Sequence, residues 1–149
     1  MAKNMKWVTR EKAKVERIAC PWLIKRFIDP NAEFLFVPRE KVLEVAKKEN
    51  AIPFDTPGAE LHHKEGKCTF EVMIEKYNLK DPALECMAKI IHGADISADI
   101  NITPESAGLK AIAFGFHYLV EDDYKKMELE FPVYDALYEY CKNKVTKKE

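Results

Sequence analysis

The sequence has little glycine and no closely spaced cysteine pair. Only five glycines occur among 149 residues, and the four cysteines are far apart in the chain, at Cys20, Cys68, Cys86 and Cys141. A zinc ribbon or a thioredoxin-type redox motif needs a CxxC pair, so neither class fits. We expect the cysteines to be free thiols in a reducing compartment.

Several motifs of common enzyme classes are also missing. The sequence contains no Walker loop, no GxGxxG and no GxSxG, so it gives no support for a nucleotide, a flavin or a serine hydrolase mechanism. No run of ~18 apolar residues occurs, and the opening "MAKNMKWVTREK" lacks the apolar stretch of a secretory signal. These absences predict a cytoplasmic protein that does not associate with membranes.

Net charge gives no electrostatic argument for a nucleic-acid partner. Lys and Arg number 24 against 25 Asp and Glu. The basic residues gather in tails at about 1–6 and 142–149, which we interpret as solvated ends and not as a binding arm. We predict a single domain over 1–149, with a small anion or a metal as its ligand, and we leave open whether it forms a homo-oligomer.

Strand-forming residues occur mainly near the front of the chain. "KWVTR" at 6–10 and "EFLFV" at 33–37 carry aromatic and β-branched residues, and the second is followed by Pro38. "AIPFDTPGAE" at 51–60 holds two prolines and a glycine, which favours an extended segment or an edge strand. The sequence therefore predicts two or three short strands in the N-terminal half.

Helical periodicity accounts for most of the remaining chain. Predicted helices cover about 16–29, 39–50, 69–79, 81–93, 103–120 and a last segment around 133–141. Asp81 before Pro82, and Thr103 before Pro104, are helix-start signals, and Gly93 is interpreted as a helix end. About six helices with two or three strands give a helix-dominated α+β fold.

Two details of these helices remain open or carry a specific expectation. The first helix begins either at Pro21, with Cys20 at the cap, or near Glu16 with Pro21 inside it. The helix "AGLKAIAFGFHYLV" is apolar on nearly every side, so we expect it at the centre of the core. His117 within it would then be a core histidine that is satisfied by a hydrogen bond.

One short stretch suggests a metal site. Glu60 and His63 in "GAELHHKEGKCTF" are three residues apart, so on a helical turn both side chains would point the same way and could bind one cation. Asp95 in "IIHGAD" is a candidate third ligand, whereas His92 at the end of its helix suits a favourable interaction with the helix dipole. A solvated, capped turn explains the same residues without a metal.

Other candidate groups are two thiols and two arginines. Cys68 lies just before a predicted helix start, where the dipole would favour a thiolate, and Cys20 would share that position if its helix begins at Pro21. Arg17 and Arg26 are nine residues apart near Trp22 and could together hold an oxyanion or carboxylate, or could pair with internal acids.

Several segments, taken together and in order, resemble the C-terminal domain of the chromate resistance protein ChrB family. They are "RIACPWLIKRFIDP", "AEFLFVP", "PFDTPGAELHHKEGKCTFEVMIEKYNL", "IIHGADI" and "VYDALYEYC". The matching positions include Glu60, His63 and Asp95, whereas His62 departs from the small residue that the family pattern has there.

The resemblance implies a cytoplasmic protein associated with chromate resistance or stress. Full-length family members carry an N-terminal region linked to regulation, which this sequence does not show, so we do not expect a DNA-binding role. The matching polar residues favour a divalent ion, Mn, Fe or Zn, at Glu60, His63 and Asp95, with redox or hydrolytic activity left open. The alternative is a non-catalytic sensor of chromate or sulfate that uses Arg17 and Arg26.

Overall fold

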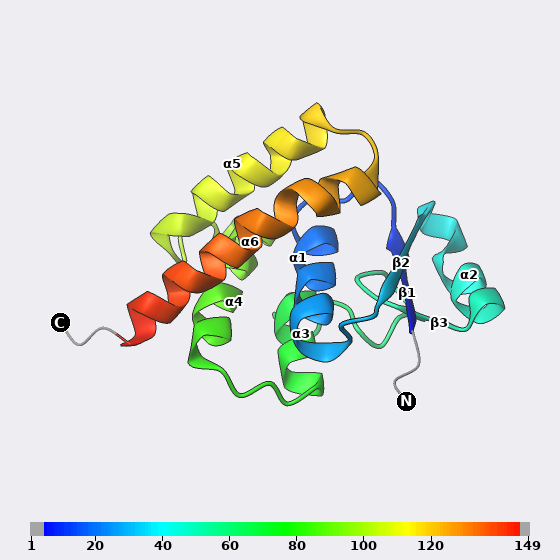
Figure 1. The fold of residues 1–149 in the computed structure, drawn as a ribbon, viewed down its shortest axis with the longest axis horizontal. Helices are drawn as coiled ribbons and strands as arrows, with labels where there is room; N and C mark the ends of the chain where they lie inside the picture. Colours follow the sequence, from blue (N-terminus) through cyan, green and yellow to red (C-terminus); the bar gives the residue numbers. More distant parts are fainter. Residues whose placement is uncertain (1–4, 147–149) are drawn as a thin grey trace.

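The computed structural model describes residues 5–146 and places a small parallel sheet at one end of a helical body (Figure 1). The sheet contains β1 (Lys6–Arg10), β2 (Glu33–Val37) and β3 (Ala51–Pro53), in the order β2-β1-β3. Both neighbours run parallel to β1. Parallel strands need crossover connections, and helices supply both of them here.

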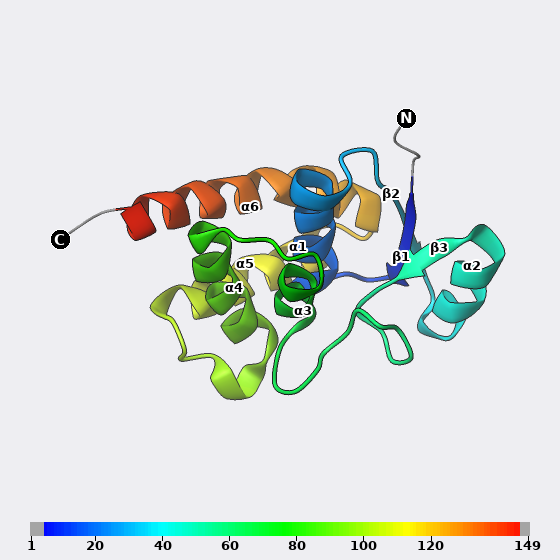
Figure 2. The same ribbon diagram turned by 90° about the horizontal axis from the view of Figure 1, so that it is seen from below.

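The central strand β1 is buried on both faces, as expected for a parallel sheet covered by helices. Trp7 faces the main core, while Val8 packs with Val42 and Ala51 in a smaller core. This smaller core is closed by α2 (Val42–Glu49), which follows the short 3-10 turn Arg39–Lys41. Figure 2 shows α2 beside the sheet, at the far end of the molecule from the last turn of the final helix, which ends at Thr146.

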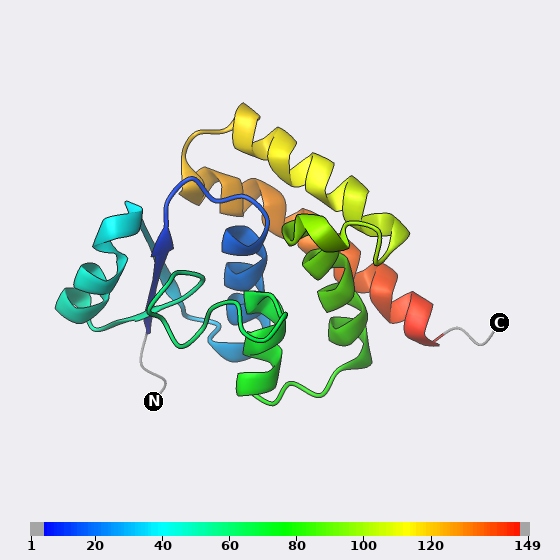
Figure 3. The same ribbon diagram turned by 180° about the vertical axis from the view of Figure 1, so that it is seen from behind.

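The other face of the sheet meets the helical body. Its helices are α1 (Glu16–Leu23), α3 (Thr69–Lys76), α4 (Pro82–Asp95), α5 (Pro104–Leu119) and α6 (Asp123–Thr146). Figure 3 shows α1, α3 and α4 side by side, and all three contact one another. The long α6 crosses α1 and α4 and closes the core (Figure 1).

The predicted fold class is confirmed: among residues 5–146, six α-helices dominate, and the three strands lie in the N-terminal half. Asp81 caps α4 through the amides of Ala83 and Leu84, and Thr103 caps α5. Of the predicted basic tails, residues 1–4 and 147–149 lie outside the described residues. Lys6 belongs to β1, and 142–146 belong to the last turns of α6.

The first helix begins at Glu16, so the second of the two predicted starts is the observed one. Cys20 and Pro21 both lie inside it. After Leu23 the backbone widens into a π-helix over Ile24–Ile28, which ends before the extended Asp29. A π-turn changes the rotation per residue, so side chains before and after it no longer follow α-helical spacing.

Gly93 does not end a helix, and that prediction was wrong. The helix α4 continues through Gly93 to Asp95. The glycine serves close packing instead, because a Cβ atom built there would lie 2.3 Å from Oγ of Ser106 on α5 and 2.8 Å from a methyl carbon of Ile102. This close approach lets α5 pack tightly against α4.

The expectation that α5 is central to the core was also wrong. Only Ser106, Leu109 and Ala113 of this helix are buried, whereas Tyr118 and Leu119 are 79% and 77% exposed. The helix lies on the outside of the body (Figures 1 and 3). His117 is accordingly only half-buried, and its Nδ1 lies 3.4 Å from Nζ of Lys126. An apolar sequence does not ensure that a helix is buried, because burial depends on which other elements pack against each of its faces.

Within 5–146, none of the helices has the length and apolar character needed to span a bilayer.

Candidate functional site: a carboxylate and histidine cluster

A cluster of acidic side chains around one histidine lies at the carboxyl edge of the parallel sheet. β1 ends at Arg10, and the loop that follows leads to Glu16 at the start of α1. β3 ends at Pro53, and Asp55 comes two residues later. Ligand sites of open parallel sheets favour this edge, because the loops that leave the strands meet there.

Glu16 forms the floor of the cluster. Glu16 is 1% exposed, and its carboxylate accepts hydrogen bonds from the backbone amides of Thr69 (3.1 Å) and Phe70 (2.5 Å). These amides belong to the first turn of α3, whose N-terminal N–H groups have no partner within the helix. Glu16 therefore joins α1 to α3 and presents its Oε1 toward the loop that precedes α3.

His63 lies in that loop and is the centre of the cluster. Its Nε2 is 2.9 Å from Oε1 of Glu16, 3.0 Å from Oδ2 of Asp95 and 3.8 Å from Oδ1 of Asp55. Asp95 is the last residue of α4. Three carboxylates from three separate segments thus converge on one imidazole nitrogen.

Asp55 connects the cluster to two arginines. Its Oδ1 accepts a hydrogen bond of 2.7 Å from the Thr69 hydroxyl. Its Oδ2 lies 3.7 Å from Arg10 and 3.5 Å from Arg17. These cations partner Asp55, while Glu16 and Asp95 depend on His63 for positive charge.

The accumulated negative charge shifts the pKa values of the group. Burial, with the charges of Glu16 and Asp55, raises the pKa of Asp95 to about 8. Burial and the charge of Glu16 also raise the pKa of Asp55. The hydrogen bond to Glu16 is the largest of the effects that raise the pKa of His63 to about 9. For Glu16, burial opposes ionisation, but the hydrogen bonds from His63 and the Phe70 amide outweigh it and lower the pKa.

The rim of the cluster is open to solvent on two sides. The side chains of His63 and Asp95 are 48% and 21% exposed, against 1% for Glu16. A pocket of about 200 Å³ adjoins His63 and Asp55. A second pocket, of about 170 Å³, adjoins Glu16 and Asp95. A small ligand can therefore reach the group without unfolding of the body.

Of the three residues predicted as metal ligands, the structure brings His63 and Asp95 together and leaves Glu60 outside. Glu60 forms a surface ion pair with Lys76, and its side chain is 64% exposed. The prediction assumed a helical turn, but residues 54–68 form an irregular loop with isolated bridges from Phe54 to Leu61 and from Lys64 to Lys67. Without helical geometry, a spacing of three does not place Glu60 and His63 on one face.

The two arginines predicted as an anion site lie apart from each other. Arg26 makes two hydrogen bonds of 3.0 Å to Asp135 of α6, which also accepts the indole N–H of Trp22. Arg17 lies beside Asp55. The π-turn between them removes the common face that their spacing suggested, so the predicted arginine pair does not form.

The two thiols predicted to be reactive are both buried. Burial, with the charge of Glu16, raises the pKa of the Cys20 thiol. The same two causes raise the pKa of Cys68 above its usual value, although Cys68 occupies the N-cap position of α3. Burial and the nearby carboxylate thus outweigh the effect of the helix terminus on the pKa of Cys68, and both residues behave as small core side chains.

A second group of metal-ligand types contains Cys68, Glu71 and His92. Glu71 accepts the Cys68 amide at 2.8 Å and lies 2.7 Å from Nδ1 of His92, whose Nε2 is 2.7 Å from Asp99. Both ring nitrogens of His92 therefore have carboxylate partners. This arrangement explains the group as a link between the start of α3 and the end of α4, as the predicted structural role of His92 suggested.

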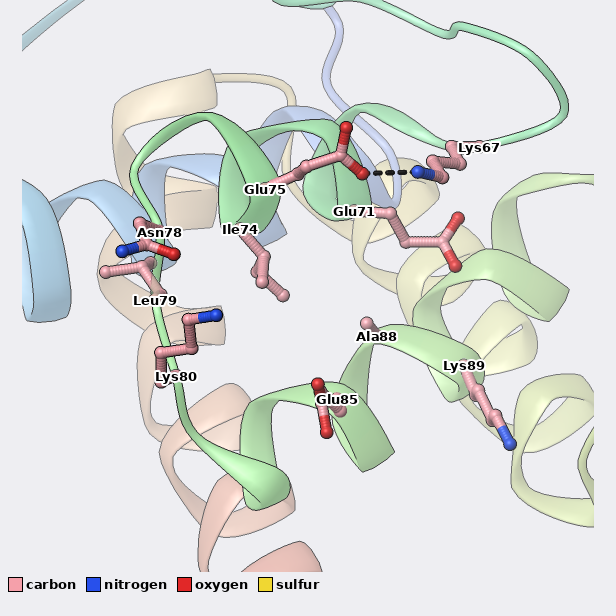
Figure 4. A pocket seen from close by; sticks show the side chains of 10 residues that line it. All are labelled: Lys67, Glu71, Ile74, Glu75, Asn78, Leu79, Lys80, Glu85, Ala88 and Lys89. Atoms are coloured by element: carbon pink, nitrogen blue, oxygen red, sulfur yellow. Dashed lines mark hydrogen bonds and ion pairs between the residues drawn. The ribbon is translucent and has the colours of Figure 1, made fainter.

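The larger pocket beside this group offers less chemistry than the cluster. Figure 4 shows this pocket, of about 370 Å³, between α3 and α4, with Lys67 and Glu75 paired at its edge and Glu71 directed toward it. Its polar lining consists mainly of separate surface side chains. Convergence of buried charged groups identifies a site better than pocket size does, so we assign the candidate site to the cluster around His63.

Sequence reasoning missed Glu16 and Asp55, and a signal existed for one of them. Glu16 shares a helical face with Ala19, Cys20 and Leu23, all of which are buried. A carboxylate on an apolar face marks a buried charge, which needs a partner. Asp55 offers no such signal, because its place beside Glu16 depends on the pairing of β3 with β1.

Known proteins resemble this chain over most of its length. The family described as "ChrB, C-terminal domain" matches residues 7–141. Protein ChrB of Cupriavidus metallidurans (strain ATCC 43123 / DSM 2839 / NBRC 102507 / CH34) is 34% identical over 135 residues. That alignment covers 89% of this chain but 39% of the relative, so this chain corresponds to well under half of that protein. No solved structure matches. The match spans both the sheet and the helical body, and the chain therefore belongs to the ChrB C-terminal domain family.

Proposed function

We propose that this domain binds one divalent cation through Glu16, Asp55, His63 and Asp95, in a process connected with chromate resistance or stress. The observation that carries the proposal is the convergence of three carboxylates on Nε2 of His63. The setting follows from the family resemblance, and the ligand set follows from the geometry. This set keeps His63 and Asp95 of the sequence prediction and replaces Glu60 by two buried acids.

The distances within the cluster suit a common ion. Ligand atoms at about 2.1 Å from a metal lie roughly 3.0 Å apart at neighbouring octahedral positions and roughly 3.4 Å apart in a tetrahedron. The separations from Nε2 of His63 are 2.9, 3.0 and 3.8 Å. Glu16, Asp55 and His63 offer ligand atoms that all lie within 4.8 Å of one another, and Asp95 adjoins this group through its contact with Nε2 of His63. Adjustment of these side chains, including that of Asp95, would bring all four groups to one centre.

The charge of the cluster also favours a cation. Arg10 and Arg17 partner Asp55, but Glu16, which is fully buried, and Asp95 share a single imidazole. Like charges at such distances cannot all ionise unless protons or a cation compensate them. A set of three oxygen ligands and one nitrogen suits Mn, Fe or Zn, and gives no preference for a thiolate zinc site.

The exposed side of His63 and Asp95 leaves room for further ligands on such an ion. An ion with an open position can polarise a substrate, activate water or exchange electrons. Redox and hydrolytic chemistry are both compatible with this arrangement. Lys14, Arg17 and Lys110 line the pocket beside Asp95, and their positive charge favours an anionic substrate.

The test is elemental analysis of the untagged protein, purified without chelators, alongside four variants. We expect close to one equivalent of Mn, Fe or Zn in the wild type and a loss of at least tenfold in occupancy for His63→Ala and Asp95→Asn. His62→Ala and Glu60→Gln are matched controls, because each lies near a proposed ligand in sequence but outside the cluster. Both controls should retain the metal.

Two results would overturn the assignment. Stoichiometric metal that persists in folded His63→Ala and Asp95→Asn proteins would place the ion elsewhere. A wild-type protein that stays metal-free after incubation with each of the three ions would show that protons, together with Arg10 and Arg17, compensate the carboxylates. Circular dichroism of every variant would confirm that a loss of metal is not a loss of fold.

A further inference from the structure

A small basic pocket directly beside the cluster has no assigned role. It has a volume of about 170 Å³ and lies where α1 begins and α4 ends, against α5. Glu16 and Asp95 of the cluster form part of its wall. The remaining charged groups of the wall are Lys14, Arg17 and Lys110. Three cations thus surround an opening that leads to the candidate metal ligands.

Two of these cations share one aromatic ring. The ammonium nitrogen of Lys14 is 4.8 Å from the ring centre of Phe114, and that of Lys110 is 5.6 Å from the same centre. Within residues 5–146, neither ammonium group has a carboxylate partner at salt-bridge distance. A cation–π contact holds each lysine over the ring but leaves its charge uncompensated. An anion between the two lysines would supply that compensation.

Arg17 adds a donor without a partner. One terminal nitrogen lies 3.5 Å from Asp55, and the other donates to the carbonyl of Lys12 at 3.2 Å. Its Nε is buried and has no hydrogen-bond partner among residues 5–146. A buried N–H that lacks an acceptor is costly, and because Arg17 lines the pocket, a reorientation of its side chain toward a bound ligand would give this N–H an acceptor.

The start of α1 contributes to the same preference. The N-cap residue of this helix is Val15, and no side chain within 5–146 caps it. Free amide groups and the positive end of the helix dipole favour a negative ligand at such a position. The uncapped terminus, the unpartnered Nε and the two ring-bound lysines are independent features that point to one charge type.

We propose that this pocket binds the negatively charged oxygen atoms of a small substrate, either a carboxylate group or a tetrahedral oxyanion, next to the ion. The inference rests on the proposed function, because Glu16 and Asp95 would repel an anion unless a cation neutralises them. Metal and anion binding should therefore be coupled. By linkage, each ligand raises the affinity for the other by the same factor.

The experiment is calorimetric titration of sulfate, and separately of acetate, into wild-type protein with and without its metal, in a buffer low in chloride. The double variant Lys14→Gln/Lys110→Gln removes two of the three cations and no proposed metal ligand. Lys89→Gln is the control, since Lys89 lies on α4 beside the larger pocket. Metal content is measured on the same samples.

For the metal-loaded wild type and the control we expect anion binding at least tenfold tighter than for the double variant, which should keep its metal. Sulfate binding without acetate binding would assign a tetrahedral oxyanion, and the reverse a carboxylate. Equal anion affinity in the double variant, or no binding to metal-loaded wild type, would overturn the pocket assignment. If the protein holds no metal yet binds an anion through these lysines, the proposed function fails and the pocket stands without the coupling.

Discussion

Replacement of Glu130 by glutamine should make this protein more stable at neutral and alkaline pH. Glu130 lies in α6 and is 2% exposed, and its buried Oε2 has no hydrogen-bond partner in the part of the chain that the structure describes. Burial raises its pKa from 4.5 to about 8, although the charge of Lys126 acts in the opposite direction. The side chain is therefore a neutral acid in the folded protein at pH 7.

The sign of the pH dependence follows from this shift. The folded state keeps a proton on Glu130 that the unfolded chain releases above about pH 4.5. Below that pH both states are protonated, so Glu130 does not lower the free energy of unfolding there. As the pH rises from there to about 8, the free energy of unfolding falls by up to ~1.4 kcal/mol per pH unit. Between pH 5 and pH 8 the total loss from this one group is at most ~3–4 kcal/mol.

Glutamine has nearly the same shape and carries no titratable proton, so Glu130→Gln removes this dependence. We expect wild type and variant to differ by less than ~1 kcal/mol at pH 5, and the variant to be more stable by ~3 kcal/mol at pH 8. Urea denaturation at pH 5, 6, 7 and 8 measures both curves. Titration of His63 and Asp95 affects both proteins alike and cancels in the difference.

Glu128→Gln is the control, because Glu128 lies on the same helix with a side chain that is 70% exposed. Its difference from wild type should be small and independent of pH. Parallel curves for wild type and Glu130→Gln would refute the reasoning, since they would show that Glu130 has the same pKa in the folded and unfolded states.

Two further substitutions test the packing and capping of α4. Gly93→Ala should lower the free energy of unfolding by ~1–3 kcal/mol in a thermal unfolding assay, because its Cβ would lie 2.3 Å from Oγ of Ser106. Gly108→Ala is the control, since a Cβ there meets open space, and it should be neutral or stabilising in that assay. Asp81→Ala should cost ~1–2 kcal/mol in urea, since Asp81 caps α4 and accepts the Tyr138 hydroxyl; an unchanged midpoint would contradict either prediction.

Local signals in the sequence predicted most of the fold. The strands at 6–10 and 33–37 follow from their aromatic and β-branched residues, and the start of α4 follows from the Asp81-Pro82 pair. These features depend on neighbours in sequence. The exposure of α5 cannot be read from neighbours in sequence, because it depends on which other helices pack against each face of α5. Gly93 shows the same limit: glycine signals a helix end and close packing equally well, and only the position of Ser106 distinguishes them.

The candidate site could be predicted only in part. The sequence motifs predict His63 and Asp95 as ligands of one site, and their side chains are in contact in the structure. The selection of Glu60 relied on helical spacing in a segment that is not helical. Asp55 reaches the cluster through strand pairing, and Glu16 through a contact with amides 53 and 54 residues away. Sequence spacing carries no information about contacts of that range.

The position of Glu16 has a consequence for the order in which the chain folds. α3 has eight residues, and isolated helices shorter than ~12–15 residues are marginal in water. The amides of its first turn donate hydrogen bonds to the carboxylate of Glu16 on α1, and α1 must already be in place to present this acceptor. We therefore expect a peptide covering 66–80 to be unstructured on its own, and α3 to form only after α1 has formed during folding.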